Sequence, residues 1–196
     1  MSLTSVILKF AAPLPKIESF DRFMFIGPHP DDIEIGAGAT AAKLAAMGKD
    51  VCFVVCADGR YGDDFLDKPL GREQIVALRQ EEAKKSAAAL SVNDIRFLNL
   101  KDGGFYEDEE LIRSLAGEIG RFKPQVIFAP DPDVSSECHA DHLNAGRAAK
   151  RLAYFAPYKG IMAEYGAECA NVEAIALYMT AKPNSYVGTK GFVSKQ

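Results

Sequence analysis

The segment FMFIGPHPDD, residues 23–32, joins a strand pattern directly to a histidine and two aspartates. Residues 23–27 are apolar or small and are typical of a buried strand. Small residues dominate the following segment and predict a helix over 37–47 that ends at Gly48. Polar side chains between a strand and a helix are typical of ligand sites at the carboxyl edge of an open α/β sheet.

The turn itself suits metal binding. His29 and Asp32 are three residues apart, and Pro28 and Pro30 stiffen the turn between them. A neutral imidazole and a carboxylate are good ligands for Zn²⁺. Asp31 lies between the two and should project differently, so it could be a base rather than a ligand. The alternative is a polar loop whose aspartates cap the next helix.

Strand and helix patterns alternate along the rest of the chain. A continuous β-branched run at 50–57 predicts a strand buried on both faces. The helix at 72–90 should bury Ile75, Leu78, Ala83 and Ala87. This order predicts an α/β, Rossmann-like fold with a mostly parallel sheet, helices on both faces and one domain over 1–196. Further strands are expected at 5–10, 95–100, 125–129 and 173–180, and further helices at 108–122 and from about 139.

Composition excludes several classes of protein. A net charge of −4 gives no basic face for nucleic acid or anionic lipid. No apolar run is long enough for a membrane span, and the N-terminal segment lacks the pattern of a signal peptide. Four cysteines without a CxxC pair fit a reducing compartment. We therefore expect a cytoplasmic protein.

A second polar cluster follows the strand at 125–129. His139 and His142 bracket Asp141 at the expected start of a helix, so the two imidazoles can share one face. The chain has three histidines, and all three follow strands and stand beside acids. A single histidine beside an aspartate is usually structural or solvated, but two such motifs on one edge of a sheet favour a metal site.

Other segments remain open to two interpretations. The polar connection at 58–71 is either a functional loop such as a lid or a mobile surface loop. Arg79 has glutamates nearby on its own helix and could form a surface ion pair with one three or four residues away. The glycines at 36–40 are a weak, partial match to a nucleotide-binding loop.

HPDD at 29–32 together with HADH at 139–142 resembles the PIG-L / LmbE family of zinc-dependent deacetylases, which act on N-acetylglucosamine-type amides. The resemblance runs from about residue 23 to 186 and includes ADG at 57–59, Arg79 with Glu82, and DGG at 102–104. It implies zinc ligands, catalytic residues and sugar contacts. The implied zinc ligands are His29, Asp32 and His142; the implied catalytic residues are Asp31 as base, His139 as acid or electrostatic partner, and Asp141 as the group that orients an imidazole; the implied substrate-binding residues are Arg79 and Asp102.

The resemblance therefore implies a zinc hydrolase that removes the acetyl group from a small N-acetylglucosamine-type amino sugar or conjugate. Three ligands leave one zinc position open for water, as in catalytic sites. The family resemblance is also compatible with a homo-oligomer. One alternative is an amidase on another N-acylated sugar, thiol-sugar or glycopeptide. The other is a non-catalytic Rossmann-like module that binds a sugar or nucleotide through the glycines at 36–40.

Overall fold

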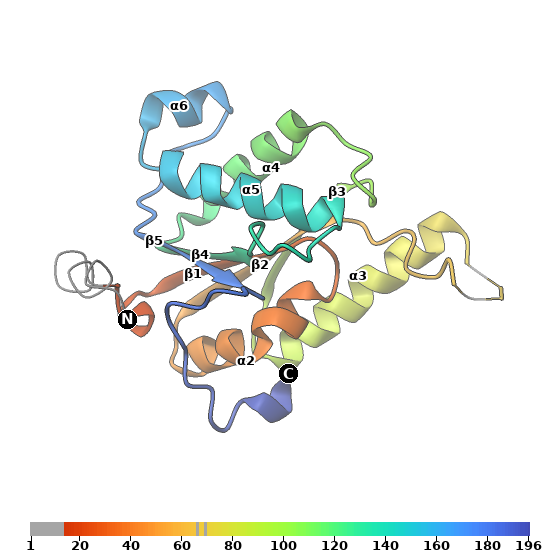
Figure 1. Ribbon diagram of the computed structural model, residues 1–196, viewed down its shortest axis with the longest axis horizontal. Coiled ribbons are helices and arrows are strands. Elements are labelled where there is room, and N and C mark those ends of the chain that lie inside the picture. The colour runs from red at the N-terminus through yellow and green to blue at the C-terminus, as the bar shows by residue number, and fades with distance from the viewer. Residues whose placement is uncertain (1–13, 66, 69) are drawn as a thin grey trace.

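The computed structural model describes residues 14–196 except 66 and 69, and its centre is a five-stranded parallel sheet (Figure 1). The strand order is β3-β2-β1-β4-β5, and every neighbouring pair is parallel. The order reverses between β1 and β4, which is where ligands bind in folds of this kind. The predicted α/β fold is thus confirmed, while the strand expected at 5–10 lies outside the described residues. The strands are β1 (Arg22–Gly27), β2 (Asp50–Ala57), β3 (Asp94–Leu100), β4 (Val126–Pro130) and β5 (Ala174–Tyr178).

Helices cover both faces of the sheet, as expected. Figure 1 shows α4, α5 and α6 on one face and α2 and α3 on the other. Side chains of β1 alternate between two apolar clusters: Met24 and Ile26 belong to one, Phe23 and Phe25 to the other. Burial on both sides explains why β1 is a continuous apolar run. The helices are α2 (Asp32–Ala46), α3 (Arg72–Ala89), α4 (Asp108–Phe122), α5 (Ala140–Phe155) and α6 (Lys159–Glu164), with short 3-10 helices η1 (Ile17–Ser19) and η2 (Val193–Lys195).

Helix α2 begins at Asp32, five residues earlier than expected, so its first turn includes part of the polar motif. The alternative of a nucleotide-binding glycine loop at 36–40 does not fit this geometry, because Gly36 lies inside the helix. A Cβ at Gly36 would lie 2.7 Å from Cε2 of the buried Tyr178 ring. The glycine there permits close packing of α2 against the end of β5.

Helix α3 corrects another expectation. Leu78 is 45% exposed, and the buried stripe runs instead through Ile75, Ala83 and Ala87. Arg79 lies four residues after Ile75 and four before Ala83, so it shares their side of the helix. This position on the helix directs the side chain of Arg79 inward, toward the carboxyl edge of the sheet.

The part of the chain that the structure describes contains no helix that is both long and apolar enough to cross a membrane.

Candidate metal centre

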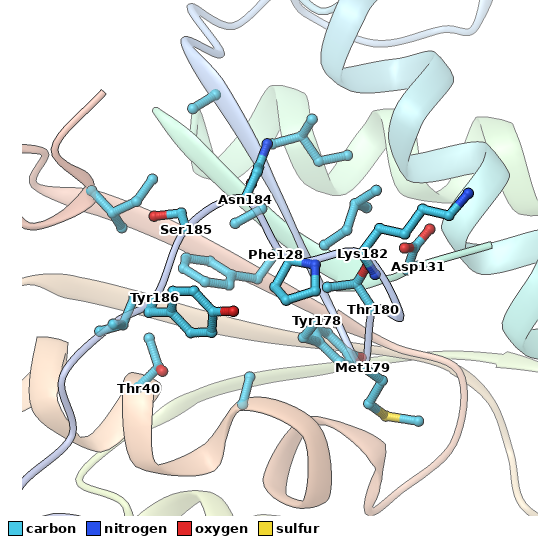
Figure 2. A pocket seen from close by; sticks show the side chains of 18 of the residues that line it. Thr40, Phe128, Asp131, Tyr178, Met179, Thr180, Lys182, Asn184, Ser185 and Tyr186 are labelled. Carbon is cyan, nitrogen blue, oxygen red and sulfur yellow. The ribbon is translucent and has the colours of Figure 1, made fainter. Parts of the chain in front are cut away.

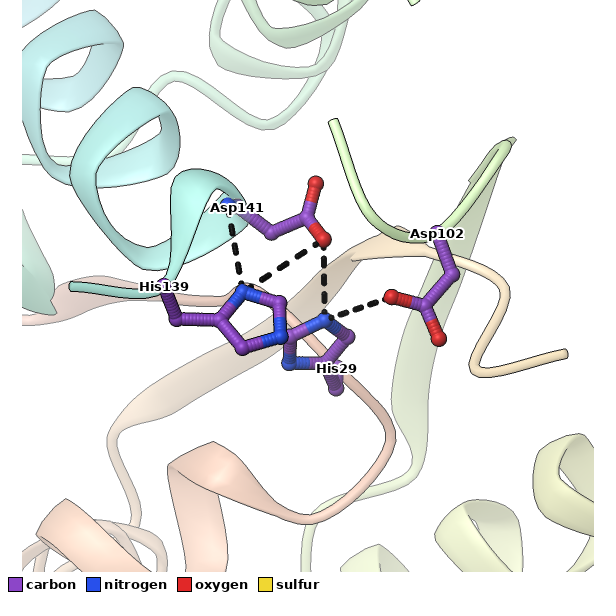
Figure 3. A group of neighbouring side chains, drawn as sticks. All are labelled: His29, Asp102, His139 and Asp141. Atoms are coloured by element: carbon purple, nitrogen blue, oxygen red, sulfur yellow. Dashed lines mark hydrogen bonds and ion pairs between the residues drawn. The ribbon is translucent and has the colours of Figure 1, made fainter. Parts of the chain in front are cut away.

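The polar segments that follow β1, β3 and β4 converge at the carboxyl edge of the sheet, beside the point where the strand order reverses (Figure 3). His29 comes from the turn after β1, and Asp102 comes from the turn after β3. His139 and Asp141 come from the start of α5, after β4. Residues up to 112 positions apart in the chain thus form one cluster.

The turn after β1 is closed by Asp32. Its Oδ2 accepts a hydrogen bond from the backbone N–H of His29 at 2.8 Å, and it lies 3.1 Å from His29 Nδ1. Asp32 is held in the first turn of α2, where the positive end of the helix dipole favours a carboxylate. The pair His29–Asp32 is therefore preformed by local structure.

The other ring nitrogen of His29 faces two more carboxylates, as Figure 3 shows. His29 Nε2 lies 3.1 Å from Asp102 Oδ1 and 3.2 Å from Asp141 Oδ2. Asp141 is fully buried and accepts backbone N–H groups of Gly103 at 2.8 Å and Gly104 at 3.0 Å. Both glycines have positive φ, which lets two successive N–H groups reach one carboxylate. These hydrogen bonds connect the DGG motif at 102–104 to the HADH motif at 139–142.

Asp102 is placed by a bulge at the end of β3. Asn99 has a φ of 58°, and the register between β2 and β3 shifts at this point. The shift lets the backbone N–H of Asp58 donate to Leu100 O at 2.9 Å, and the backbone N–H of Asp102 lies 3.4 Å from Asp58 Oδ1. The predicted contact of Asp102 with a sugar stays a prediction; in this structure its carboxylate contacts His29.

His142 lies next to Asp32 and Glu137. Its Nε2 lies 3.4 Å from Asp32 Oδ2, and its Nδ1 lies 2.9 Å from Glu137 Oε2. Glu137 also accepts the backbone N–H of His139 at 2.8 Å. Sequence reasoning missed Glu137, although an acid five residues before a candidate histidine ligand was a usable signal.

His139 precedes α5 as its N-cap residue. Its Nδ1 accepts the backbone N–H of Asp141 at 3.3 Å, in the place usually taken by a serine or aspartate oxygen. This bond needs a lone pair on Nδ1, so the neutral ring carries its proton on Nε2. The ring centroid lies 4.6 Å from that of His29, and the side chain is half-exposed.

Asp31 stands at the N-cap position of α2 but makes no capping hydrogen bond with its side chain. Its Oδ2 lies 2.8 Å from Arg79 Nη2 instead. Arg79 therefore reaches across from α3 to the polar turn and pairs with Asp31 rather than with a glutamate of its own helix. The predicted roles of Asp31 as base and Arg79 as a sugar contact stay predictions.

Two groups of described side chains could hold a metal ion, and they share His29. The first is His29, Asp32 and His142; the second is His29, Asp102, His139 and Asp141. In each, the donor atoms lie within 4.8 Å of one another. The first fits Zn²⁺ better, because both of its imidazoles have a carboxylate at the second ring nitrogen, as metal-bound histidines usually do. Two nitrogens and one oxygen also match a catalytic zinc set.

The surrounding carboxylates set the charges of this centre. Burial lowers the pKa of His29, but hydrogen bonds to three aspartates outweigh it and raise the pKa to about 11. Burial acts to raise the pKa of Asp32, and hydrogen bonds from His142 and His29 hold it well below the usual range. A metal ion that binds here must therefore displace imidazole protons.

A large cavity lies outside this centre. Its volume is about 1040 Å³, and it is lined mainly by β5, the segment after it and the end of β4. Figure 2 shows Phe128, Tyr178 and Tyr186 around it. Among the described residues, no member of the two metal-binding groups lines this cavity.

Comparison with known proteins points to one family. The model of the family described as "PIG-L: GlcNAc-PI de-N-acetylase" matches residues 24–153. The diacetylchitobiose deacetylase of Thermococcus kodakarensis is 31% identical over 169 residues, covering 85% of this chain and 62% of the relative. The 1D-myo-inositol 2-acetamido-2-deoxy-alpha-D-glucopyranoside deacetylase of Thermomonospora curvata is 32% identical, covering 84% of this chain and 61% of the relative.

A solved structure extends the likeness to the fold. The N,N'-diacetylchitobiose deacetylase from Pyrococcus horikoshii, determined with an inhibitor, is 30% identical with a TM-score of 0.80. The match covers 97% of this chain and 74% of that one. The chain thus spans about three fifths of the length of the two curated relatives and about three quarters of this structure.

Proposed function

This chain belongs to the PIG-L family, and on that premise we propose that it is a zinc-dependent hydrolase that removes the acetyl group from a small N-acetylglucosamine-type sugar conjugate. The single observation that carries the proposal is the group His29, Asp32 and His142, in which both imidazoles are backed by carboxylates. The named activities of the two curated relatives and the solved structure support the same class of substrate.

His29 Nδ1, Asp32 Oδ2 and His142 Nε2 would hold the ion, since these are the atoms that face one another. When bound, Zn²⁺ polarises a carbonyl group and lowers the pKa of water to about 7. Asp102 and Asp141 hold the opposite nitrogen of His29, and Glu137 holds that of His142. These contacts would leave one lone pair of each ring available to the ion.

Asp31 is the proposed general base. Arg79 binds its Oδ2, which leaves Oδ1 to accept a proton from the attacking water. The water oxygen forms a bond to the acetyl carbon, and the bond from that carbon to the sugar nitrogen breaks. Asp31 then gives the proton to the departing nitrogen, so the products are acetate and the free amino sugar.

His139 is the proposed partner of the developing negative charge. Its Nδ1 is occupied by the backbone N–H of Asp141, so Nε2–H is the group that can donate to the carbonyl oxygen. Its half-exposed position beside His29 is compatible with contact to a substrate.

The proposal is tested with purified protein by metal analysis and by acetate release from N,N'-diacetylchitobiose and N-acetylglucosamine. Asp31→Asn should keep its zinc and lose activity by roughly 10²–10⁴-fold. His142→Ala should lose zinc itself. Unchanged turnover in Asp31→Asn, or turnover that survives complete removal of the metal, would overturn the assignment.

The alternative hydrolase activities differ from the proposed one in substrate, not in fold. An amidase on another N-acyl sugar, thiol-sugar or glycopeptide would use the same centre, and a series of acyl lengths separates these substrates. The non-catalytic nucleotide-binding module has no glycine loop to support it, because Gly36 and Gly38 lie inside α2.

A further inference from the structure

We propose that Tyr61 and Phe105 form an aromatic subsite that packs against the C–H face of a pyranose ring of the substrate. The inference rests on the proposed function, and it deepens that function by naming side chains that would select sugar conjugates over simple acetamides. Tyr61 follows β2 and Phe105 follows β3, so both belong to connections at the carboxyl edge of the sheet.

Gly103 lies between the two rings and the proposed metal centre. The backbone N–H of Gly103 donates to Asp141 Oδ2 at 2.8 Å, and Asp141 contacts His29. A Cβ added to Gly103 would lie 3.0 Å from Phe105 Cε2 and 3.8 Å from Tyr61 Cε2. The rings therefore lie beside the same glycine whose backbone N–H binds Asp141, a carboxylate in contact with His29.

The two rings are held in a defined arrangement. Their centroids lie 6.4 Å apart at an interplanar angle of 72°, which is an edge-to-face contact. The Arg72 guanidinium lies 4.7 Å from the centroid of Tyr61, and Lys101 Nζ lies 4.9 Å from that of Phe105. A ring fixed in advance loses little conformational freedom when a ligand binds to it.

Phe105 nevertheless remains 64% exposed. Exposed aromatic side chains that are clustered beside a polar centre are typical of binding surfaces. A pyranose ring carries C–H groups on its face and hydroxyl groups around its rim. Its face can pack on Phe105 while its hydroxyl groups reach Lys101, whose ammonium group already lies over the same ring.

The test measures binding without turnover. In the zinc-loaded Asp31→Asn protein, N,N'-diacetylchitobiose and N-acetylglucosamine are titrated and followed by NMR or calorimetry. Adding Phe105→Ala to this protein should weaken the binding of at least one of these sugars by about 3- to 10-fold. Phe105→Trp in place of Phe105→Ala should keep most of the original affinity, because an aromatic face is retained. Tyr154→Ala is the matched control, since Tyr154 is 67% exposed near the distant end of α5 and should leave binding unchanged.

Loss with the disaccharide alone would place its second ring on Phe105, whereas loss with both sugars would place the N-acetylglucosamine ring there. Equal binding by the Asp31→Asn protein with and without Phe105→Ala overturns the subsite. So does a loss of sugar binding that is accompanied by an equal loss of zinc affinity, because the effect would then pass through Gly103 and Asp141.

The outcome is separable from that of the proposed function. If the protein binds sugar through Phe105 but releases no acetate under any metal condition, the deacetylase proposal fails and the subsite stands. If acetate is released with the same kcat/KM by wild type and Phe105→Ala, the subsite fails and the deacetylase proposal stands.

Discussion

His29 Nε2 and Asp141 Oδ2 lie 3.2 Å apart, although 112 residues separate them in the chain. The contact joins the turn after β1 to the start of α5, across the point where the strand order reverses. Asp141 is fully buried and also accepts two backbone N–H groups, so it orients the ring of His29 and fixes the turn after β3 at once. We therefore expect metal binding by the proposed centre to depend on this carboxylate.

Replacing Asp141 by Asn should weaken zinc binding by roughly 10–100-fold, because the amide cannot hold His29 as a carboxylate does. Competition with a chromophoric chelator measures the affinity. Asp133→Asn is the control, since Asp133 is exposed and pairs with Lys150 away from the centre. Equal zinc affinity of Asp141→Asn and wild type would show that the contact has no part in metal binding.

Replacing Arg79 by Gln should lower kcat by about 10–100-fold while zinc content stays the same, because Asp31 would lose the group that positions it. Arg113→Gln is a suitable comparison, as Arg113 makes an exposed pair with Glu109. Steady-state kinetics separates the two roles of Arg79. A rise confined to KM would favour direct contact with the substrate, as the family resemblance implies, over positioning of Asp31.

Gly36→Ala should lower the free energy of unfolding by about 1–3 kcal/mol, because the new methyl group would overlap the buried ring of Tyr178. Gly160→Ala in α6 has open space around it and should be neutral or stabilising by up to about 1 kcal/mol. Urea unfolding of the two variants measures both changes. A Gly36→Ala protein as stable as wild type would mean that α2 and Tyr178 separate at little cost.

Stability should fall above about pH 10, the ordinary pKa of tyrosine. Burial raises the pKa of Tyr178 well above its usual value, and its hydroxyl group donates to Ile26 O at 2.8 Å. The neutral form is thus favoured in the folded state. The associated stability is complete below the unfolded pKa and is lost as pH rises toward the folded pKa, by at most about 1.4 kcal/mol per pH unit.

Urea unfolding between pH 8 and about pH 11 measures this loss. Tyr178→Phe should show a shallower decline than wild type, whereas Tyr186→Phe, at an exposed position, should decline as wild type does. Identical slopes for wild type and Tyr178→Phe would contradict the assignment to Tyr178.

Much of the centre could be predicted because its residues stand next to the ends of strands. The apolar runs identified β1 and β4 in the sequence. The histidines and acids that follow these strands had to meet at one edge of a parallel sheet. Arg79 was harder to place, because Leu78 suggested a different buried stripe. Its direction follows from the phase of Ile75 and Ala83, and that phase became clear only once α3 was packed on the sheet.

Sequence alone was sufficient for the α/β order and for which polar segments follow the strands at one edge of the sheet, because hydrophobic period and strand ends are local properties of the chain. Packing was needed to establish which carboxylates each imidazole nitrogen faces. His29 is oriented by Asp102 and Asp141 and His142 by Glu137, and these carboxylates reach the rings from separate turns. Contacts of this kind depend on the relative placement of several elements, which no local pattern specifies.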